Sequence, residues 1–291
     1  MNIYYVDCIE GELFKDPNGN PLVHSFSKLP FRIQKITLCP SSRYTQQLIQ
    51  EAKFRQKQIN FNSANSSGVI RPQEEVMYKS LCGLLIEQLC YQMLKHYNSN
   101  KNVSIELDRS FNSIDQIDLR ICKTWLDHNS ECHNVTKTVE IRSSFPFKPI
   151  EKVVSHDFDI LGGYTNNVKI GEVEKDFYLR FLFSLDYPEH LYVKNGNKID
   201  YNKTTLNVLR NLYFDEELNL QRDMNIYFIG GATKSMMADE SISYNGSMTS
   251  SNFNKSHNAQ YRKLKARNAL DCVSIIQMML NVITSEAVNG K

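Results

Sequence analysis

Two short segments carry acidic and basic side chains at a spacing that could support catalysis. In "KTVEIRSSF" (137–145), Val139 and Ile141 flank Glu140, and Arg142 follows. Side chains two residues apart in a strand point to the same face, so Glu140 and Arg142 emerge together, opposite Val139 and Ile141. The pair is therefore either an ordinary ion pair on a solvated sheet or part of a catalytic site.

A second acid, Asp118, stands at the start of the preceding strand-like segment, "QIDLRI". The polar turn "DHNSECHN" joins the two segments, which can pair as an antiparallel hairpin and bring Asp118 and Glu140 within reach of one ion. Mg²⁺ needs oxygen ligands, and two carboxylates with water and a substrate phosphate are a common set. Arg142 could then polarise the scissile phosphate or stabilise its developing charge.

This order of elements resembles the core of the PD-(D/E)xK nuclease superfamily. An amphipathic helix with acids precedes "IDLRI", a hairpin and "VEIRS", so the resemblance covers about residues 70–145. It implies a Mg²⁺-dependent endonuclease that hydrolyses DNA, of the type II restriction or phage-defence kind, and often a homodimer. Asp118 and Glu140 would bind the metal, and Arg142 stands where the family usually has Lys.

Arginine is too basic to take a proton from water near neutral pH. In a working site Arg142 would therefore stabilise charge, and the metal or the substrate phosphate would activate the water. The departure from the family pattern also fits a rival of another class, a non-catalytic nucleic-acid or protein interaction module with an inactive nuclease-like site. The absent lysine favours this rival, and the acid pair at hairpin reach opposes it.

A third carboxylate from the preceding helix is usual in such sites. Glu74 falls on the same helical stripe as Leu81 and would assist through water. The alternative role for Glu74 is a first-turn acid that complements the helix dipole. Glu87, near the edge of the stripe, is the fallback for the helical acid, and Asp115 is the alternative to Asp118.

A basic run indicates where nucleic acid could bind. We expect a long amphipathic helix from about residue 258 to 287, with cations around its first turns. Phosphates attract such clusters, although a solvated face is the commoner explanation. The residues predicted to contact DNA are Arg262, Lys263, Lys265, Arg267 and Lys234.

A second set of acids and a lysine occurs in and before "GEVEKDFYLRF". It comprises Glu172, Glu174 and Lys175, with Asp157 and Asp159 upstream. Because Glu174 and Lys175 are adjacent, they would point to opposite faces of a strand, and a solvated turn is the favoured interpretation.

Two further motifs are disfavoured as functional sites. His128, Cys132 and His133 cluster in the hairpin turn, but no second ligand pair accompanies them as zinc would require. The segment "FIGGATKSMM" lacks the glycine and lysine spacing of a phosphate-binding loop.

The elements that must position these residues indicate an α/β fold. Helical patterns at 41–59 and 72–98 are followed by strand-like runs, which predicts a central mixed β-sheet flanked by helices and a long C-terminal helix. We expect one nuclease-like domain over residues 1–291, with its core at about 70–185 and elaborations at 1–69 and 186–291. Residues 239–256, rich in Ser and Asn, are expected to form a loop.

Composition places the chain among ordinary globular proteins. The net charge of +2 and the hydrophobic content of 41% exclude a disordered chain and a strongly basic coat, though not a local basic groove. Scattered cysteines without a CxxC pair fit a reducing compartment. The N-terminus lacks the basic region of a signal peptide, and no apolar run reaches the roughly 18 residues of a membrane span. We therefore expect a soluble cytoplasmic protein.

Overall fold

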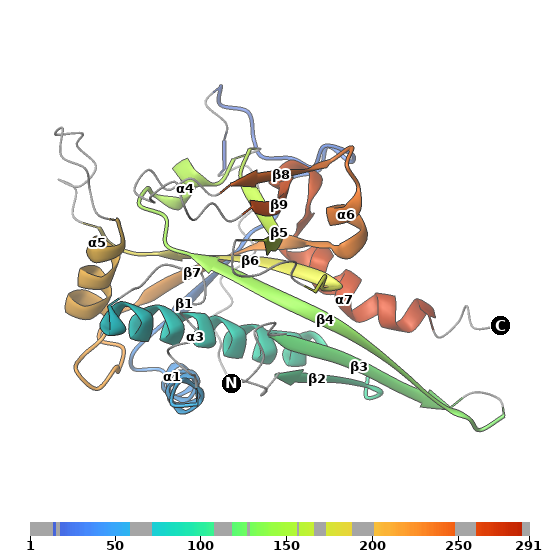
Figure 1. The fold of residues 1–291 in the computed structure, drawn as a ribbon, viewed down its shortest axis with the longest axis horizontal. Helices are drawn as coiled ribbons and strands as arrows, with labels where there is room; N and C mark the ends of the chain where they lie inside the picture. Colours follow the sequence, from blue (N-terminus) through green and yellow to red (C-terminus); the bar gives the residue numbers. More distant parts are fainter. Residues whose placement is uncertain are drawn as a thin grey trace.

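The computed structural model describes residues 14–15, 18–58, 72–107, 118–126, 129–155, 157–165, 173–187, 201–247 and 260–286. A mixed β-sheet flanked by helices forms its centre (Figure 1), which confirms the predicted α/β class. Neighbouring strands are antiparallel except β4 and β6, which run parallel. In spatial order the strands are β1 (Gln34–Leu38), β7 (Met224–Thr233), β6 (Phe177–Ser184), β4 (Cys132–Ser144), β3 (Leu119–Leu126) and β2 (Val103–Leu107), and β10 (Leu270–Asp271) also pairs with β7.

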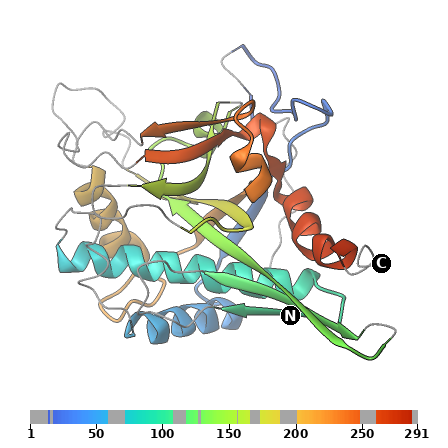
Figure 2. The ribbon, with the colours of Figure 1, turned by 45° about the vertical axis from the view of Figure 1, so that its right-hand side comes forward.

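Helices cover one face of this sheet. In both views α1 (Arg43–Gln56) and α3 (Gln73–Tyr97) lie side by side beneath it (Figures 1 and 2). They share one apolar cluster with α7 (Cys272–Glu286) and with the alternate residues of β6, such as Phe177 and Leu179. Ser42 caps α1, and Pro72 stands at the N-cap of α3.

The opposite face of the central sheet carries a second, smaller sheet. Its order is β5 (Asp159–Thr165), β9 (Gln260–Lys265) and β8 (Ser243–Ser247). A separate apolar cluster lies here, to which β6 contributes Tyr178 and Leu182. Because β6 is covered on both faces, its run "FYLRFLFS" is almost wholly buried, as expected for a central strand. The described residues also form the short helices α4 (Ile150–Val153), α5 (Tyr201–Val208) with a π-helical turn at Leu209–Tyr213, and α6 (Lys234–Ala238), and a 3-10 turn at Ala266–Asn268.

The C-terminal part differs from the sequence expectation. Residues predicted to begin a long helix near 258 instead form β9, and α7 starts only at Cys272. The expected loop at 239–256 likewise contains β8, which pairs with β9. The spacing of Tyr261 and Leu264 suits one face of a helix, but pairing with β5 and β8 decides the conformation, because tertiary contacts override local preference.

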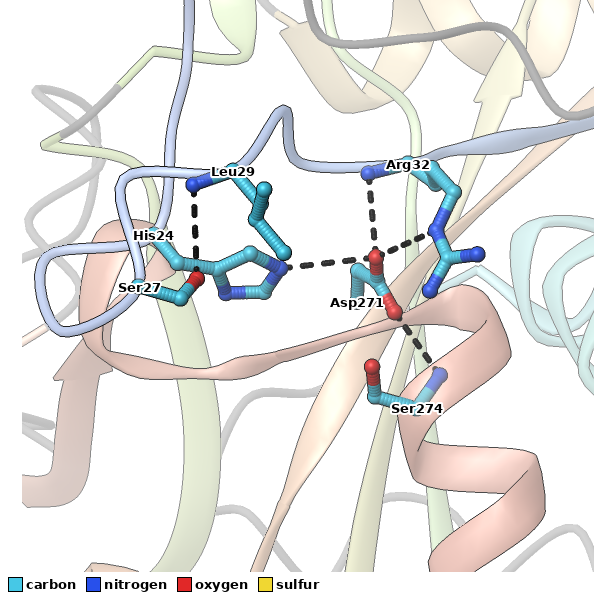
Figure 3. A network of polar contacts seen from close by, with 6 residues as sticks. All are labelled: His24, Ser27, Leu29, Arg32, Asp271 and Ser274. Carbon is cyan, nitrogen blue, oxygen red and sulfur yellow. Dashed lines mark hydrogen bonds and ion pairs between the residues drawn. The ribbon is translucent and has the colours of Figure 1, made fainter.

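Asp271 fastens the N-terminal segment to this region (Figure 3). Its buried carboxylate accepts hydrogen bonds from Arg32 Nε at 2.9 Å and from the backbone N–H of Ser274 at 2.7 Å, and His24 Nε2 lies 3.4 Å away. The Ser274 bond makes Asp271 an N-terminal cap of α7. These bonds lower the pKa of Asp271 well below its usual range.

Among the described residues, no helix combines the length and hydrophobicity needed to span a bilayer.

Candidate functional site

The two predicted catalytic strands are neighbours, as expected. β3 and β4 form an antiparallel hairpin whose last registered pair is Leu119 with Val139. Just before β3, the Asp118 N–H donates to the carbonyl of Val139 at 3.2 Å. Its carboxylate accepts a hydrogen bond from the Ile141 N–H at 2.5 Å. Asp118 therefore lies beside the peptide group that joins Glu140 to Ile141.

Val139 and Ile141 point from β4 toward the apolar core on the helix side of the sheet. Glu140 and Arg142 point to the opposite side of β4. Their ion pair has an Nη2–Oε1 distance of 3.0 Å, with side chains only 8% and 21% exposed for Glu140 and Arg142 respectively. The interpretation as an ordinary solvated surface pair is therefore wrong. Taking these charges out of water is unfavourable unless contacts or a function compensate.

A third acid, Glu87, lies near Asp118. Glu87 extends from α3 and forms an ion pair with Arg55 of α1 at 2.7 Å. Burial and the negative charge of Glu87 raise the pKa of Asp118 well above its usual range, while the Ile141 N–H, Arg142 and Arg55 act in the opposite direction. Two acids, Asp118 and Glu87, are thus held close enough to repel one another, between two arginines.

Glu74, the predicted helical acid, lies elsewhere. Its carboxylate forms an exposed ion pair with Arg210 at 3.1 Å. Thirteen residues separate Glu74 from Glu87 on the same helix, which corresponds to about 20 Å along the axis. The stripe pattern placed Glu74 on a suitable face but at the wrong level of the helix, so the fallback residue Glu87 takes its place.

The basic run predicted to contact DNA lies in β9 and the turn after it. Lys263 and Lys265 both form ion pairs with Asp159, at 3.3 and 3.1 Å. Arg262 Nε donates to the carbonyl of Met237 at 2.7 Å, whereas Arg267 is exposed. The run is therefore not the free end of a helix, and its two lysines already serve to join β9 to β5.

Lys234 is also engaged, in an exposed ion pair with Glu174 at 3.0 Å. In the second acid-and-lysine set, the favoured interpretation as a solvated turn is wrong for Lys175, which is only 1% exposed and donates to the carbonyl of Val173 at 3.0 Å. Asp157 contributes its backbone carbonyl to Lys265, and Glu172 lies outside the described residues.

Within the part of the chain that the structure describes, no group of three or more His, Cys, Asp or Glu side chains could hold a metal ion. The ring of His133 stacks on Trp125, with centroids 5.4 Å apart. His128 and Asp115 lie outside the described residues.

Two participants were missed at the sequence level, Arg55 and Arg180. Each stands in an apolar context, Arg55 on the buried side of α1 and Arg180 inside the run "FYLRFLFS". A lone charge among buried positions was the signal that could have found them.

A cavity of about 510 Å³ between the end of α3 and α7 is lined by none of the candidate-site residues.

Comparisons with known proteins give one relative. "Uncharacterized protein MJECS01" of the archaeon Methanocaldococcus jannaschii is 32% identical over 184 residues, which is 58% of this chain and 60% of that protein. The match thus spans less than two thirds of the relative's length. No family model matches the chain, and no solved structure matches it.

Proposed function

We propose that this protein is a Mg²⁺-dependent endonuclease that hydrolyses DNA phosphodiester bonds, of the restriction or phage-defence type. The observation that supports this most is the bond of the Asp118 carboxylate to the Ile141 N–H, between the positions of Glu140 and Arg142 in β4, with Glu87 beside Asp118. Perturbed acids packed against basic residues are a frequent property of catalytic sites.

The donor set suits a hard divalent cation. Glu87 and Asp118 raise each other's electrostatic energy, which a cation between the acids would relieve. Mg²⁺ is commonly bound through one or two carboxylates, with water and substrate phosphate completing the shell. In this proposal two carboxylates, Asp118 and Glu140, would hold the ion. Bound there, Mg²⁺ would lower the pKa of a water and offset charge on the phosphate.

Arg142 has the role of charge stabilisation in this proposal. It is partly exposed, so its guanidinium can reach a substrate while one amino group stays on Glu140. A planar, permanently charged fork fits phosphate oxygens well but does not remove protons near neutral pH. Arg142 would therefore bind the scissile phosphate as negative charge develops.

We propose a nucleic-acid-binding surface that includes only some of the basic residues predicted from the sequence. Arg267 and Lys234 are exposed and can contact phosphates, and the partly exposed Arg262 lies against α6, where it donates to the carbonyl of Met237. Lys263 and Lys265 neutralise Asp159 instead. A homodimer remains part of the proposal because the resemblance implies it, and a cytoplasmic location remains part of it because the scattered cysteines fit a reducing compartment.

The second candidate function is an interaction module without catalysis. It is favoured by the two ion pairs, Arg55 with Glu87 and Arg142 with Glu140, which neutralise acids that a metal would otherwise use. Such pairs would persist in a site that has lost its metal.

The experiment is a plasmid-cleavage assay with purified protein. We expect nicking that needs Mg²⁺ and stops with EDTA, and a loss of at least about 100-fold in Asp118→Asn and Glu140→Gln. Glu74→Gln, an exposed acid on the same helix as Glu87, is the matched control and should cut like the parent. Metal-independent cutting, or equal rates in all three variants, would sink the nuclease proposal. No cutting alongside retained DNA binding would favour the interaction module.

A further inference from the structure

Arg180 is a buried cation in the middle of the central sheet. It lies on β6 in register with Arg142 of the parallel strand β4, and side chains at paired positions share a face. Glu140 and Tyr178 form the neighbouring registered pair. Arg180 therefore projects beside Arg142, between the central sheet and the strand pair β5–β9, and is only 5% exposed.

Within the described ranges, Arg180 has no carboxylate as a counter-ion. One amino group donates to the Ser144 hydroxyl at 2.8 Å, and the guanidinium lies 5.5 Å from the ring centroid of Phe158. Its Nε is buried and has no hydrogen-bond partner in the part of the chain that the structure describes. No carboxylate of the described residues forms an ion pair with it, and the nearby Asp159 is already bound by Lys263 and Lys265.

Such an arrangement is unfavourable in the isolated protein. A buried charge needs a partner of opposite sign, and an unsatisfied buried donor loses its hydration without compensation. The neighbouring positive charge of Arg142 adds to this, and together with burial it lowers the pKa of Arg180 to about 10. Arg180 is therefore a buried positive charge that the described carboxylates do not pair with. It lies on β6, next to the strand β4 that carries Glu140.

We propose that Arg180 and Arg142, with the Ser144 hydroxyl, form a binding site for a phosphate group of a nucleic-acid strand. The identification of the ligand as nucleic acid rests on the proposed function, whereas the need for an anion follows from Arg180 alone. Two guanidinium forks and a hydroxyl match the several acceptor oxygens of one phosphate. The site lies beside Glu140, so the bound phosphate is at or next to the scissile one.

A ligand can reach this site from its rim. Arg142, Ser144 and Phe158 are all partly exposed, while Arg180 forms the floor. The Ser144 hydroxyl already orients one amino group of Arg180, which leaves Nε as the donor for an incoming oxygen. The phosphate would thus replace a missing counter-ion without displacing an existing pair of Arg180.

The test uses the full chain and its Arg180→Met and Arg180→Lys variants. Thermal unfolding is followed with increasing inorganic phosphate, and binding of a fluorescent single-stranded oligonucleotide is measured without metal. We expect phosphate to raise the Tm of the parent and not that of Arg180→Met. That variant should also bind the oligonucleotide about 10- to 100-fold more weakly, the scale of one hydrogen bond to a charged group. Arg180→Lys should fall between the two.

A folding defect would not imitate this result. Without phosphate, Arg180→Met should unfold at the same temperature as the parent or higher, because a buried unpaired charge has been removed. Arg222→Met, which alters an exposed arginine paired with Asp186, is the matched control and should keep the phosphate response.

Each outcome separates the site from the proposed function. A phosphate response that persists in Arg180→Met would overturn the site. A lost phosphate response with unchanged oligonucleotide affinity would overturn the assignment to a nucleic-acid strand, in favour of free phosphate. A third outcome is that Arg180→Met loses both the phosphate response and oligonucleotide binding, while the parent does not cleave DNA. This outcome would support the phosphate site and overturn the nuclease proposal.

Discussion

The Asp118 carboxylate accepts a hydrogen bond from the Ile141 N–H at 2.5 Å, across 23 residues of sequence. Ile141 follows Glu140 in β4. It lies two residues beyond Val139, which pairs with Leu119, the first residue of β3. The Asp118 side chain thus supplies the hydrogen-bond acceptor for the Ile141 N–H. If β3 began earlier in the chain, one of its backbone carbonyls would be the acceptor instead. An acid with a raised pKa is fixed next to Glu140 by this bond.

Asp118→Asn should not destabilise the protein at pH 8 in metal-free buffer. The pKa of Asp118 is raised in the folded state, so the folded protein binds the proton more tightly than the unfolded chain. Stability then falls as the pH rises from about 4, the unfolded value, through the raised folded value. Asparagine avoids this loss and still accepts from Ile141. Thermal unfolding should show a Tm equal to or above the parent's at pH 8, with the gain absent below about pH 4; a clear decrease at pH 8 would contradict this account.

Glu87→Gln should be much more harmful to stability than Glu74→Gln. Glu87 neutralises Arg55, whose side chain is only 9% exposed, so its loss leaves a buried cation without its partner. We expect a cost of about 1–3 kcal/mol in urea unfolding. Glu74 belongs to an exposed pair, and its replacement should cost less than about 1 kcal/mol. Equal effects of the two substitutions would show that the Arg55–Glu87 pair is not an internal contact.

Arg142→Ala should lower the rate of DNA cleavage by about 10²–10³-fold, the scale for removing one preorganised donor. Binding of DNA without metal should weaken less than turnover does, because Arg142 shares the phosphate site with Arg180 and contacts that strengthen in the transition state act on turnover. Arg142→Lys should keep partial activity because it restores a positive charge on a similar stem. Single-turnover rates decide between these outcomes, and an alanine variant as fast as the parent would leave Arg142 only as the ion-pair partner of Glu140.

Asp271→Asn should weaken the acid-side dependence of stability. The pKa of Asp271 is lowered by its bonds to His24, Arg32 and Ser274, so its contribution is present above the unfolded pKa near 4 and is lost as the pH falls toward the folded value. The parent should therefore lose stability between about pH 5 and pH 2 more steeply than the variant. Urea unfolding at several pH values measures this, and parallel curves for the two proteins would refute it.

Gly230→Ala should destabilise the contact of β10 with β7. Gly230 has a φ of +132°, and an added Cβ would lie 2.2 Å from the carbonyl oxygen of Leu270. Backbone strain of this kind costs about 1–3 kcal/mol, and the clash adds to it. Gly83→Ala is the control, since a Cβ there meets nothing within 4 Å and should stabilise α3 by about 0.5–1 kcal/mol. A Gly230→Ala protein as stable as the parent in urea would show that β10 can move away freely.

The sequence by itself determined the local elements around the candidate site. Strand-like runs of residues predicted β3, β4, β6 and β7, and helical periodicity predicted α1 and α3. It also placed Glu140 and Arg142 on one face, because a strand repeats every two residues. These features depend on neighbours a few positions away in the chain.

Tertiary structure alone decided which distant residues meet. Glu74 and Glu87 both satisfy the helical pattern, and only the packing of α3 against α1 and β4 brings Glu87 to Asp118. Residues 260–265 form the strand β9 because their backbone pairs with β5 and β8. Periodicity records which side of an element is buried, but not what lies opposite. For that reason the buried, unpaired charge of Arg180 became visible only once two sheets enclosed it.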